Sequence, residues 1–410
     1  MSEWRDVPLR DLCHSVQYGV TASAAKDRNE GPRLLRITDI VPPRIDWESV
    51  PVCDLPETKI AKYQLHQGDI VVARSGSVGY AKLVDHPPRR AVFASYLVRF
   101  QVQEGIDSRY VGQVVQSTAY REFVIAHAGG AAQPNANAKT LGAFPVPIPT
   151  LPTQRRIAAV LSTFDELIEI NQRRIELLED LARSLYREWF VRFRFPGHED
   201  ATFVDSTRGE IPERWTVRRL DAIAAIIMGQ SPKSEFYNEI GEGLPFHQGV
   251  ADYGDLLPTH RKYCTLESRT ADAMDLLCSV RAPVGRLNLA DERLVIGRGL
   301  SGIRRVDHNQ ALLLEQLRSP LGEEDSLGSG TIFKAINKEQ LGGLPIVEPA
   351  ADIGSAFELT ARPMLDERVQ RTLQNRQLAT TRDLLLPRLV TGRLDISHID
   401  LGELLPPEPA

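Results

Sequence analysis

The sequence predicts an α+β protein in which two similar globular domains are separated by a long antiparallel pair of coiled-coil helices. Three observations support this prediction. The second half of the chain repeats landmarks of the first half in the same order, and each half ends in a long helical run. The segments before those runs mix β-rich stretches with short helical patterns. The repeat also predicts a pseudo-twofold relation between the two halves.

The repeat is clearest just before each long helical run. Gly130, Asn137, Leu141, Gly142 and Pro145 recur at one constant offset as Gly330, Asn337, Leu341, Gly342 and Pro345. Other landmarks keep their order along the chain: Trp4 with Trp215, Gly19 with Gly229, Asp69 with Asp275, and Gly79 with Gly285. Chance matches rarely preserve order over a whole chain. We therefore favour an internal duplication over coincidental turn glycines.

The composition is that of an ordinary globular protein, with 42% hydrophobic and 25% charged residues, which argues against disorder. A length of 410 residues fits two domains and additional helix. The four cysteines show no CxxC spacing and the nine histidines form no ligand cluster, so we expect a reduced, cytoplasmic, metal-free protein. The amino-terminal segment does not resemble a signal peptide, and no apolar run is long enough to predict a membrane span.

The net charge of −5 is unfavourable for a nucleic-acid partner if only the total is considered. Residues 1–150 nevertheless carry a slight basic excess, whereas residues 199–348 are acidic overall. Any binding to DNA must therefore depend on local loops rather than on the charge of a whole domain.

Within the first globular part, residues 69–73 and 91–100 are rich in β-branched and aromatic side chains and are predicted to be strands. Residues 110–126 have apolar side chains near helical spacing and are predicted to be a helix. We expect domain boundaries at residues 1–150, 151–198, 199–348 and 349–396, followed by a tail at 397–410. The second and fourth of these segments are the predicted spacer helices.

The first spacer helix is predicted from Thr153, as its N-cap after Pro152, to Phe193, and would span roughly 60 Å. Steps of four and three residues define its seam over about five heptads. The seam consists of Ile157, Leu161, Phe164, Ile168, Asn171, Ile175, Leu178, Ala182, Leu185 and Trp189. Asn171 either fixes the register of the helix pair or lies at a solvated edge.

The second spacer helix has a poorer seam, with Leu365, Val369, Leu373, Arg376, Thr380 and Leu384, and it is interrupted by Pro363 and Arg376. Pro363 is expected to kink or break its first turns, which leaves open a start after Pro363. Two helices of similar length in one chain pack most simply in antiparallel orientation.

Four stretches together resemble type I restriction-modification specificity subunits over essentially the whole chain. The stretch from Leu151 to Ala158, reading LPTQRRIA, is similar to the central region of that family. The stretches 130–138, 209–215 and 386–392 are similar to its other landmarks and follow in the same order.

The resemblance implies a DNA-recognition subunit without catalytic chemistry of its own, in which each globular domain is a target-recognition domain. Each domain would read one half of a split, asymmetric site in double-stranded DNA, and the helices would measure the gap and dock two methyltransferase subunits. No cofactor is expected in this chain. S-adenosylmethionine for methylation at adenine N6, ATP and Mg would belong to the methyltransferase and the restriction/translocase subunits.

Arginine reads guanine, and asparagine or glutamine reads adenine, through paired hydrogen bonds in the major groove. Residues of this kind, with neighbouring hydroxyl and lysine side chains, occur on loops at matched places of the two halves. In the first half they are Arg74, Ser75, Ser77, Tyr80, Gln133, Asn135, Asn137 and Lys139. In the second half they are Arg281, Arg286, Arg298, Ser329, Thr331, Lys334 and Lys338. Any one of them could equally be an ordinary surface turn residue.

The sequence also bears on two other functions, an enzyme and an adaptor. An enzyme is disfavoured because the sequence contains no phosphate loop, nucleophile elbow or methyltransferase pocket; residues 85–89 come nearest to a methyltransferase motif, but they lack its aromatic residue. A coiled-coil adaptor without a DNA-reading role is the alternative function. The acidic residues Glu323, Glu324 and Asp325 beside the second loop are unfavourable near phosphate and must point away if the DNA-reading interpretation holds.

Overall fold

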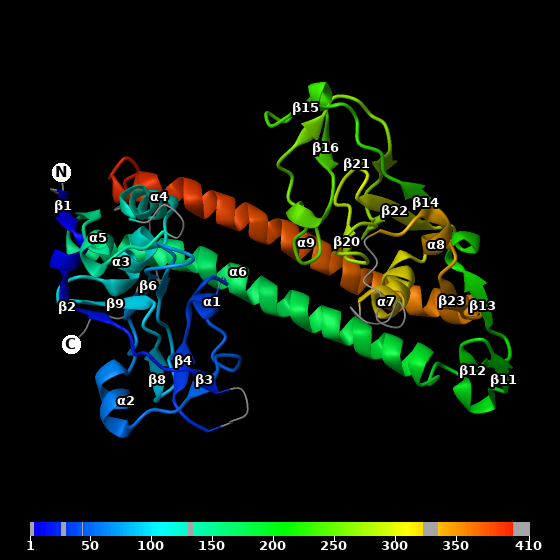
Figure 1. Cartoon of the computed structure of the whole chain (residues 1–410), viewed down its shortest axis with the longest axis horizontal. Coiled ribbons are helices and arrows are strands. Elements are labelled where there is room, and N and C mark those ends of the chain that lie inside the picture. Colours follow the sequence, from blue (N-terminus) through cyan, green and yellow to red (C-terminus); the bar gives the residue numbers. More distant parts are fainter. Residues whose placement is uncertain (1–3, 26–29, 43, 130–133, 323–334, 397–410) are drawn as a thin grey trace. The chain divides into compact units, whose positions relative to one another are not determined.

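The computed structural model describes residues 4–25, 30–42, 44–129, 134–322 and 335–396, with the side chains of 319–322 excluded. The chain forms two compact units (Figure 1). Unit 1 comprises Met1–Ile170 and Asn375–Ala410, and unit 2 comprises Asn171–Gln374. Each unit combines a globular part with a portion of both long helices, so the separate globe and helix segments expected from the sequence remain a proposal.

Unit 1 contains two four-stranded sheets and one two-stranded sheet. The first sheet has the order β2 (Cys13–Tyr18), β9 (Leu97–Val102), β6 (Ile70–Ala73) and β7 (Ala81–Leu83). The second has the order β3 (Ala24–Ala25), β5 (Val52–Cys53), β4 (Arg33–Leu35) and β8 (Ala91–Phe93), with β4 and β8 parallel. Strand β1 (Arg5–Pro8) pairs with β10 (Pro145–Ile148). The helices are α1 (Ile37–Ile40), α2 (Glu57–Tyr63), α3 (Ser108–Val115), α4 (Thr118–His127) and α5 (Ala138–Leu141).

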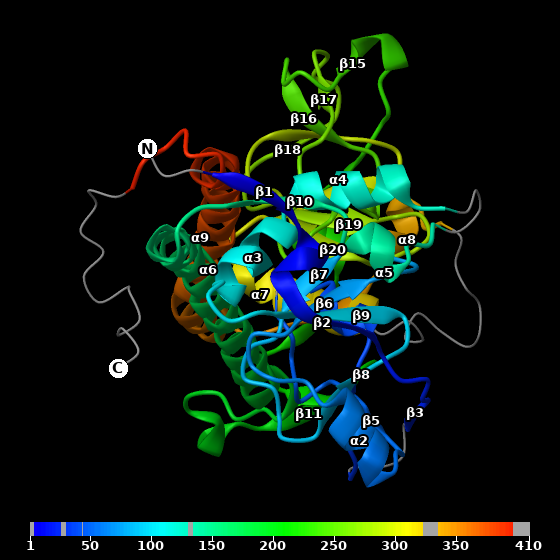
Figure 2. The same ribbon diagram turned by 90° about the vertical axis from the view of Figure 1, so that its left-hand side faces the viewer.

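The central strand β6 explains how the layers of unit 1 pack. All four of its residues are buried, and successive side chains of a strand point to opposite faces. Ile70 and Val72 pack with the helices α3 and α4, whereas Val71 and Ala73 pack with the second sheet. The apolar run that predicted a strand at residues 69–73 is therefore buried on both faces, between a helical layer and a sheet layer (Figure 2).

Unit 2 repeats this topology. Its first sheet has the order β14 (Ala224–Met228), β22 (Leu300–Arg305), β19 (Leu276–Ser279) and β20 (Leu287–Leu289). Its second sheet contains β15 (Tyr237–Asn238), β17 (Tyr263–Cys264), β16 (Leu244–His247), β21 (Leu294–Ile296) and β18 (Thr270–Ala271), with β16 and β21 parallel. Strand β13 (Thr216–Arg219) pairs with β23 (Pro345–Glu348), and β11 (Phe203–Ser206) pairs with β12 (Gly209–Pro212). The helices are α7 (Gln310–Gly322) and α8 (Lys338–Gly342). The matching strand orders confirm the internal repeat.

Several residues that recur in both halves have structural roles. Asn137 and Asn337 cap α5 and α8, accepting hydrogen bonds from the backbone N–H groups of Thr140 (2.8 Å) and Gln340 (2.9 Å). A Cβ atom on Gly19 would lie 2.2 Å from the Ala94 carbonyl oxygen, and one on Gly229 would lie 2.2 Å from that of Gly297. Only glycine permits these close approaches.

The long helix α6 (Leu151–Tyr186) begins two residues earlier than predicted. Pro152 lies in its first turn, where an N–H group has no intrahelical acceptor and a proline is tolerated. The α-helix ends at Tyr186 and continues as a π-helical turn, Arg187–Val191, rather than reaching Phe193 as an α-helix. All ten seam positions are buried or half-buried. The solvated-edge alternative for Asn171 is wrong, because its side chain is 6% exposed and donates a hydrogen bond to Gln374 (3.1 Å).

The second long helix α9 (Ala351–Val390) runs without interruption through Pro363, which corrects the expected break. Pro363 lies on the exposed face, where water can serve the carbonyl group that loses its partner. The assignment of Leu384 to the seam is also wrong, because this side chain is 62% exposed. At about 100° per residue, Leu384 lies about 100° around the helix from Leu365. Leu386 and Leu389 are buried in the core of unit 1 instead.

The two long helices pack in antiparallel orientation within each unit. In unit 1, Asp165 of α6 pairs with Arg382 of α9 (2.5 Å), and Asn375 donates to the Ile168 carbonyl oxygen (3.2 Å). In unit 2, Arg174 pairs with Glu367 (2.9 Å). Later residues of α6 thus meet earlier residues of α9, which confirms the predicted helix pair.

Two other sequence predictions need correction. The single strand expected at residues 91–100 is interrupted at Ala94–Tyr96 and becomes β8 and β9, which belong to different sheets. The single helix expected at residues 110–126 is divided into α3 and α4, because the Ser117 side chain caps α4 and starts a new helix there.

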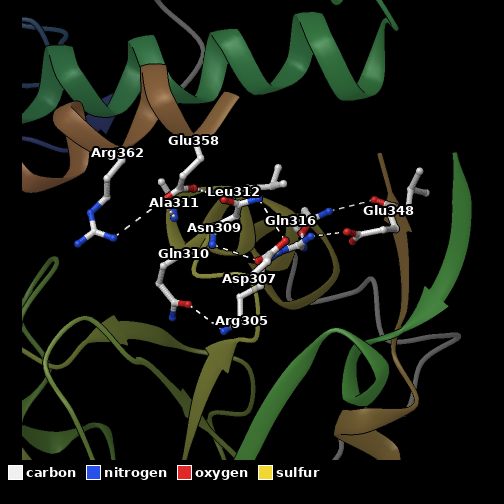
Figure 3. A network of polar contacts seen from close by, with 11 residues as sticks. Arg305, Asp307, Asn309, Gln310, Ala311, Leu312, Gln316, Glu348, Glu358 and Arg362 are labelled. Atoms are coloured by element: carbon white, nitrogen blue, oxygen red, sulfur yellow. Dashed lines mark hydrogen bonds and ion pairs between the residues drawn. The ribbon is translucent and has the colours of Figure 1, made fainter. Parts of the chain in front are cut away.

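A buried polar network stabilises unit 2 around Arg305, which is 2% exposed (Figure 3). Its guanidinium group donates to Asp307 (2.7 Å), to Gln316 of α7 (2.9 Å) and to Glu348 of β23. Burial opposes the charge, but the hydrogen bonds to Asp307 and Glu348 raise the pKa of Arg305. This network fixes α7 and β23 against the end of β22.

Candidate nucleic-acid interface

In unit 1, the loop after β6 joins the segment before α5. Ser75 and Asn135 form an antiparallel bridge, and the Ala136 N–H donates to the Arg74 carbonyl oxygen (2.8 Å). Four of the predicted DNA-reading positions, Arg74, Ser75, Ser77 and Asn135, therefore lie in one loop cluster. Gln133 lies outside the described residues.

Arg74 is held in place by its neighbours in this cluster. Its guanidinium group lies 5.1 Å from the ring centre of Tyr18 and donates to the Asn135 side-chain oxygen (3.4 Å). The Tyr18 hydroxyl in turn accepts from the Ala138 N–H (2.9 Å). Arg74 is thus a preorganised donor, and Tyr18 is a supporting residue that the sequence prediction missed. Its position beside the repeated Gly19 was the available signal.

The other predicted residues of unit 1 fall into two groups. Tyr80 is half-buried and stacks with Arg121, whose guanidinium group lies 3.9 Å from the ring centre. Tyr80 therefore packs within the fold, and Asn137 uses its side-chain oxygen as a helix cap. Lys139 is exposed on α5 beside the loop cluster.

Unit 2 contains the equivalent loop cluster. Arg281 and Ala335 form an antiparallel bridge, and the Ile336 N–H donates to the Val280 carbonyl oxygen (2.9 Å). A hollow of about 300 Å³ lies beside this cluster. We call it the Arg281 hollow; its lining is Gln248, Gly249, Val250, Ser279, Arg281, Ala282, Arg298 and Gly299.

Two of the predicted residues, Arg281 and Arg298, therefore meet at one site, although they are distant in sequence. Arg286 and Lys338 are exposed but do not line the hollow. Ser329, Thr331 and Lys334 lie outside the described residues, as do Glu323, Glu324 and Asp325. Gln248 and Gly249 were not predicted, because no sequence motif marks the segment that follows β16.

Charge pairing distinguishes the two arginines of the hollow from Arg304 of the same unit. Arg304 is bound by Asp272 and Asp275 (both 2.6 Å), and these hydrogen bonds raise its pKa. Among the residues that the structure describes, the exposed side chains of Arg281 and Arg298 form no hydrogen bond or ion pair. Unpaired guanidinium groups on loops are available to an anionic or acceptor-bearing ligand.

Two cysteines and the distribution of metal-ligating side chains can be assessed within the described residues. Burial raises the pKa of Cys13 and of Cys278 to about 12, so both thiols stay protonated. In the described ranges, no group of three or more histidine, cysteine or acidic side chains is arranged to hold a metal ion. In the same part of the chain, every helix is too short or too polar to cross a bilayer.

The fold and its two loop clusters define a repeated recognition protein built on an antiparallel helix pair, and comparison with known proteins gives its family. A family model described as "Type I restriction modification DNA specificity domain" matches residues 1–180. The chain is 30% identical over 406 residues to the putative type I restriction enzyme MjaX specificity subunit of Methanocaldococcus jannaschii, covering 96% of this chain and 94% of that protein. It is 20% identical over 471 residues to the type I restriction enzyme HindI specificity subunit of Haemophilus influenzae, covering 96% and 100%.

The fold also matches a solved structure, the type I restriction-modification S subunit from M. genitalium. The TM-score is 0.62 at 14% identity, with 95% of this chain and 96% of that chain covered. The chain belongs to the type I restriction-modification specificity subunits. It is the non-catalytic, DNA-binding specificity subunit of such a system and assembles with other subunits, to which the cofactors belong.

Proposed function

We propose that unit 1 and unit 2 each read one half of a bipartite, asymmetric DNA site through their loop clusters. The main support for this proposal is that the two units share one backbone arrangement but present different loop side chains. In unit 1, backbone contacts join the loop after β6 to the segment before α5. In unit 2, equivalent contacts join the loop after β19 to the segment before α8. The first cluster presents Arg74 and Asn135, whereas the second presents Arg281 and Arg298. Different donors on one scaffold are expected to recognise different half-sites.

The long helices are proposed to set the gap between the half-sites and to dock two methyltransferase subunits. The seam itself is occupied by the helix pair, so docking requires another face. Along α6, apolar side chains that point away from the seam are exposed: Leu167 (43%) and Ile170 (59%) in unit 1, and Leu177 (70%) and Leu181 (53%) in unit 2. Their spacing of three, four or seven residues places them on one face of the helix, which suits a protein partner.

In this proposal the catalytic chemistry takes place in the partners. The methyltransferase subunits would bind S-adenosylmethionine and methylate adenine N6, and restriction/translocase subunits would use ATP and Mg. The complex would act in the cytoplasm, where the DNA is. The globular segments 1–150 and 199–348 correspond to the proposed target-recognition domains.

The proposal is tested by purifying the chain with its methyltransferase partner and selecting bound sequences from a random double-stranded DNA library at several salt concentrations. The expected result is a motif of two short, different half-sites with an unread gap of fixed length. Affinity should fall steeply with salt as phosphate contacts are lost. A complex that binds every sequence equally would contradict the proposal and favour the coiled-coil adaptor.

A further inference from the structure

The residues that line the Arg281 hollow have counterparts in unit 1, and backbone hydrogen bonds show which residues correspond. The Val280 N–H donates to the Gly299 carbonyl oxygen (2.9 Å), as the Arg74 N–H does to that of Tyr96 (2.9 Å). Likewise, the Gly297 N–H donates to His247 (2.8 Å), as the Ala94 N–H does to Leu35 (2.9 Å). In this correspondence Arg281 replaces Ser75, Arg298 replaces Ser95, Gly299 replaces Tyr96, and Gln248 replaces Arg36.

These replacements change the chemistry of the site. In unit 1, Tyr96 is 60% exposed, and Arg36 is already paired with Asp39 (2.8 Å). The corresponding donors of unit 2 are free. Among the residues that the structure describes, the side chains of Arg281, Arg298 and Gln248 make no hydrogen bond or ion pair.

Two glycines line the hollow. A Cβ atom on Gly299 would lie 2.3 Å from the Gln248 carbonyl oxygen, so glycine is required where this turn meets the 248–249 segment. A Cβ atom on Gly249 would meet no atom within 4 Å. The space beside this glycine is therefore open. The hollow is a built feature of the backbone, lined by three unused polar side chains.

We propose that Arg281 and Arg298, with Gln248, are specificity-determining residues of unit 2 and read a G·C base pair. The inference rests on the proposed function of unit 2 as a reader of one half-site. Arginine donates two parallel hydrogen bonds to O6 and N7 of guanine. The carboxamide of Gln248 adds an acceptor for the N4 amino group of the paired cytosine. A phosphate group offers no donor to that oxygen, so a base-pair edge would use both the guanidinium donors and the carboxamide acceptor of the hollow.

The experiment compares variants in the complex with the methyltransferase partner, using the same random DNA library. Arg281→Lys keeps the charge but removes the forked donor. It should reduce discrimination at one G·C position of a single half-site by about 10- to 100-fold, and the other half-site should be unchanged. Gly249→Val keeps both arginines but adds a branched side chain at the wall of the hollow, and should relax the same position. Arg293→Lys, also exposed in unit 2 but outside the hollow and paired with Glu267 (2.9 Å), is the matched control and should change nothing.

Thermal unfolding of each variant is the control for a retained fold. The opposite result is that Arg281→Ala lowers the affinity for all sequences equally and makes the salt dependence shallower. That result would identify a phosphate contact and overturn the inference. An unchanged preference at every position with Arg281→Lys and Gly249→Val would also overturn it. If the unmodified complex shows no sequence preference, the proposed function itself fails, so the two failures are distinguishable.

Discussion

The carboxylate of Glu179 on α6 accepts a hydrogen bond from the guanidinium group of Arg368 on α9 (2.5 Å), and the Arg368 side chain is only 2% exposed. Arg318 of α7 binds the same carboxylate (2.8 Å). Burial disfavours the charged form of Glu179, but Arg368, Arg318 and Arg183 outweigh it and lower its pKa. Three helices of unit 2 therefore depend on one carboxylate.

Replacing Glu179 by glutamine should destabilise unit 2 by about 3 kcal/mol, because it removes the hydrogen-bonded counter-charge of the buried Arg368. The measurement is urea-induced unfolding of the full chain. Glu176→Gln is the control: Glu176 is exposed on the same helix and should contribute less than about 0.5 kcal/mol. Equal effects of the two substitutions would contradict the assigned role of Glu179.

His247 predicts a pH dependence of stability. Its side chain is fully buried, and burial, with a smaller effect of the neighbouring His260, lowers its pKa from 6.5 to about 4, although Asp252 and Asp291 act in the opposite direction. The folded state therefore binds fewer protons than the unfolded state between pH 6.5 and 4. The stability contributed by neutral His247 is present above pH 6.5 and is lost as the pH falls toward 4, by up to about 3 kcal/mol.

The test is the variant His247→Leu, which introduces the residue found at the equivalent position, Leu35, in unit 1. Thermal unfolding followed from pH 7 to pH 4 should show a shallower loss of stability than in the unmodified protein. His14→Leu, at an exposed position, should retain the original profile. A profile left unchanged by His247→Leu would show that other groups cause the acid sensitivity.

Substitution of Pro363 tests whether α9 is continuous through this position. Because α9 passes through this exposed proline, Pro363→Ala should restore a backbone hydrogen bond and stabilise the protein by about 1 to 3 kcal/mol in urea unfolding. Pro387→Ala, also exposed on α9 but near its C-terminal end, is a useful comparison. If the helix began after Pro363, the substitution would be neutral or destabilising.

The exposed apolar face of α6 predicts where partners bind. A double substitution of Leu177 and Leu181 by glutamate should abolish co-purification of a methyltransferase subunit while leaving thermal unfolding of the chain unchanged, because both side chains face solvent. Glu166→Gln, at another exposed position of α6, is the control. Full retention of both partner subunits by the double variant would place docking elsewhere.

Much of the scaffold was predictable because it depends on local patterns. Helical spacing identified the α6 seam, and the repeated Asn137 and Asn337 marked helix starts. Pro363 and Leu384 were misjudged for different reasons. A proline is tolerated where its face is solvated, which depends on tertiary packing, and a seam drawn in steps of three and four drifts from the 3.6-residue turn over a long helix.

The site was predictable only as a set of candidates. Arg281 and Arg298 were identified as donors, but their meeting at one hollow depends on how β19 and β21 are placed in two adjoining sheets. Gln248 and Gly249 belong to no sequence motif. Tyr80 was expected on an exposed loop but is half-buried in the fold. Contacts between residues distant in sequence determine which loop side chains are free to bind.

The two units are proposed to read two different half-sites. Mapping every methylated adenine in the DNA of cells that express this chain with its methyltransferase tests it most directly. We expect one asymmetric motif of two half-sites with a gap of constant length. A continuous motif, a symmetric one, or methylation without a sequence preference would contradict it.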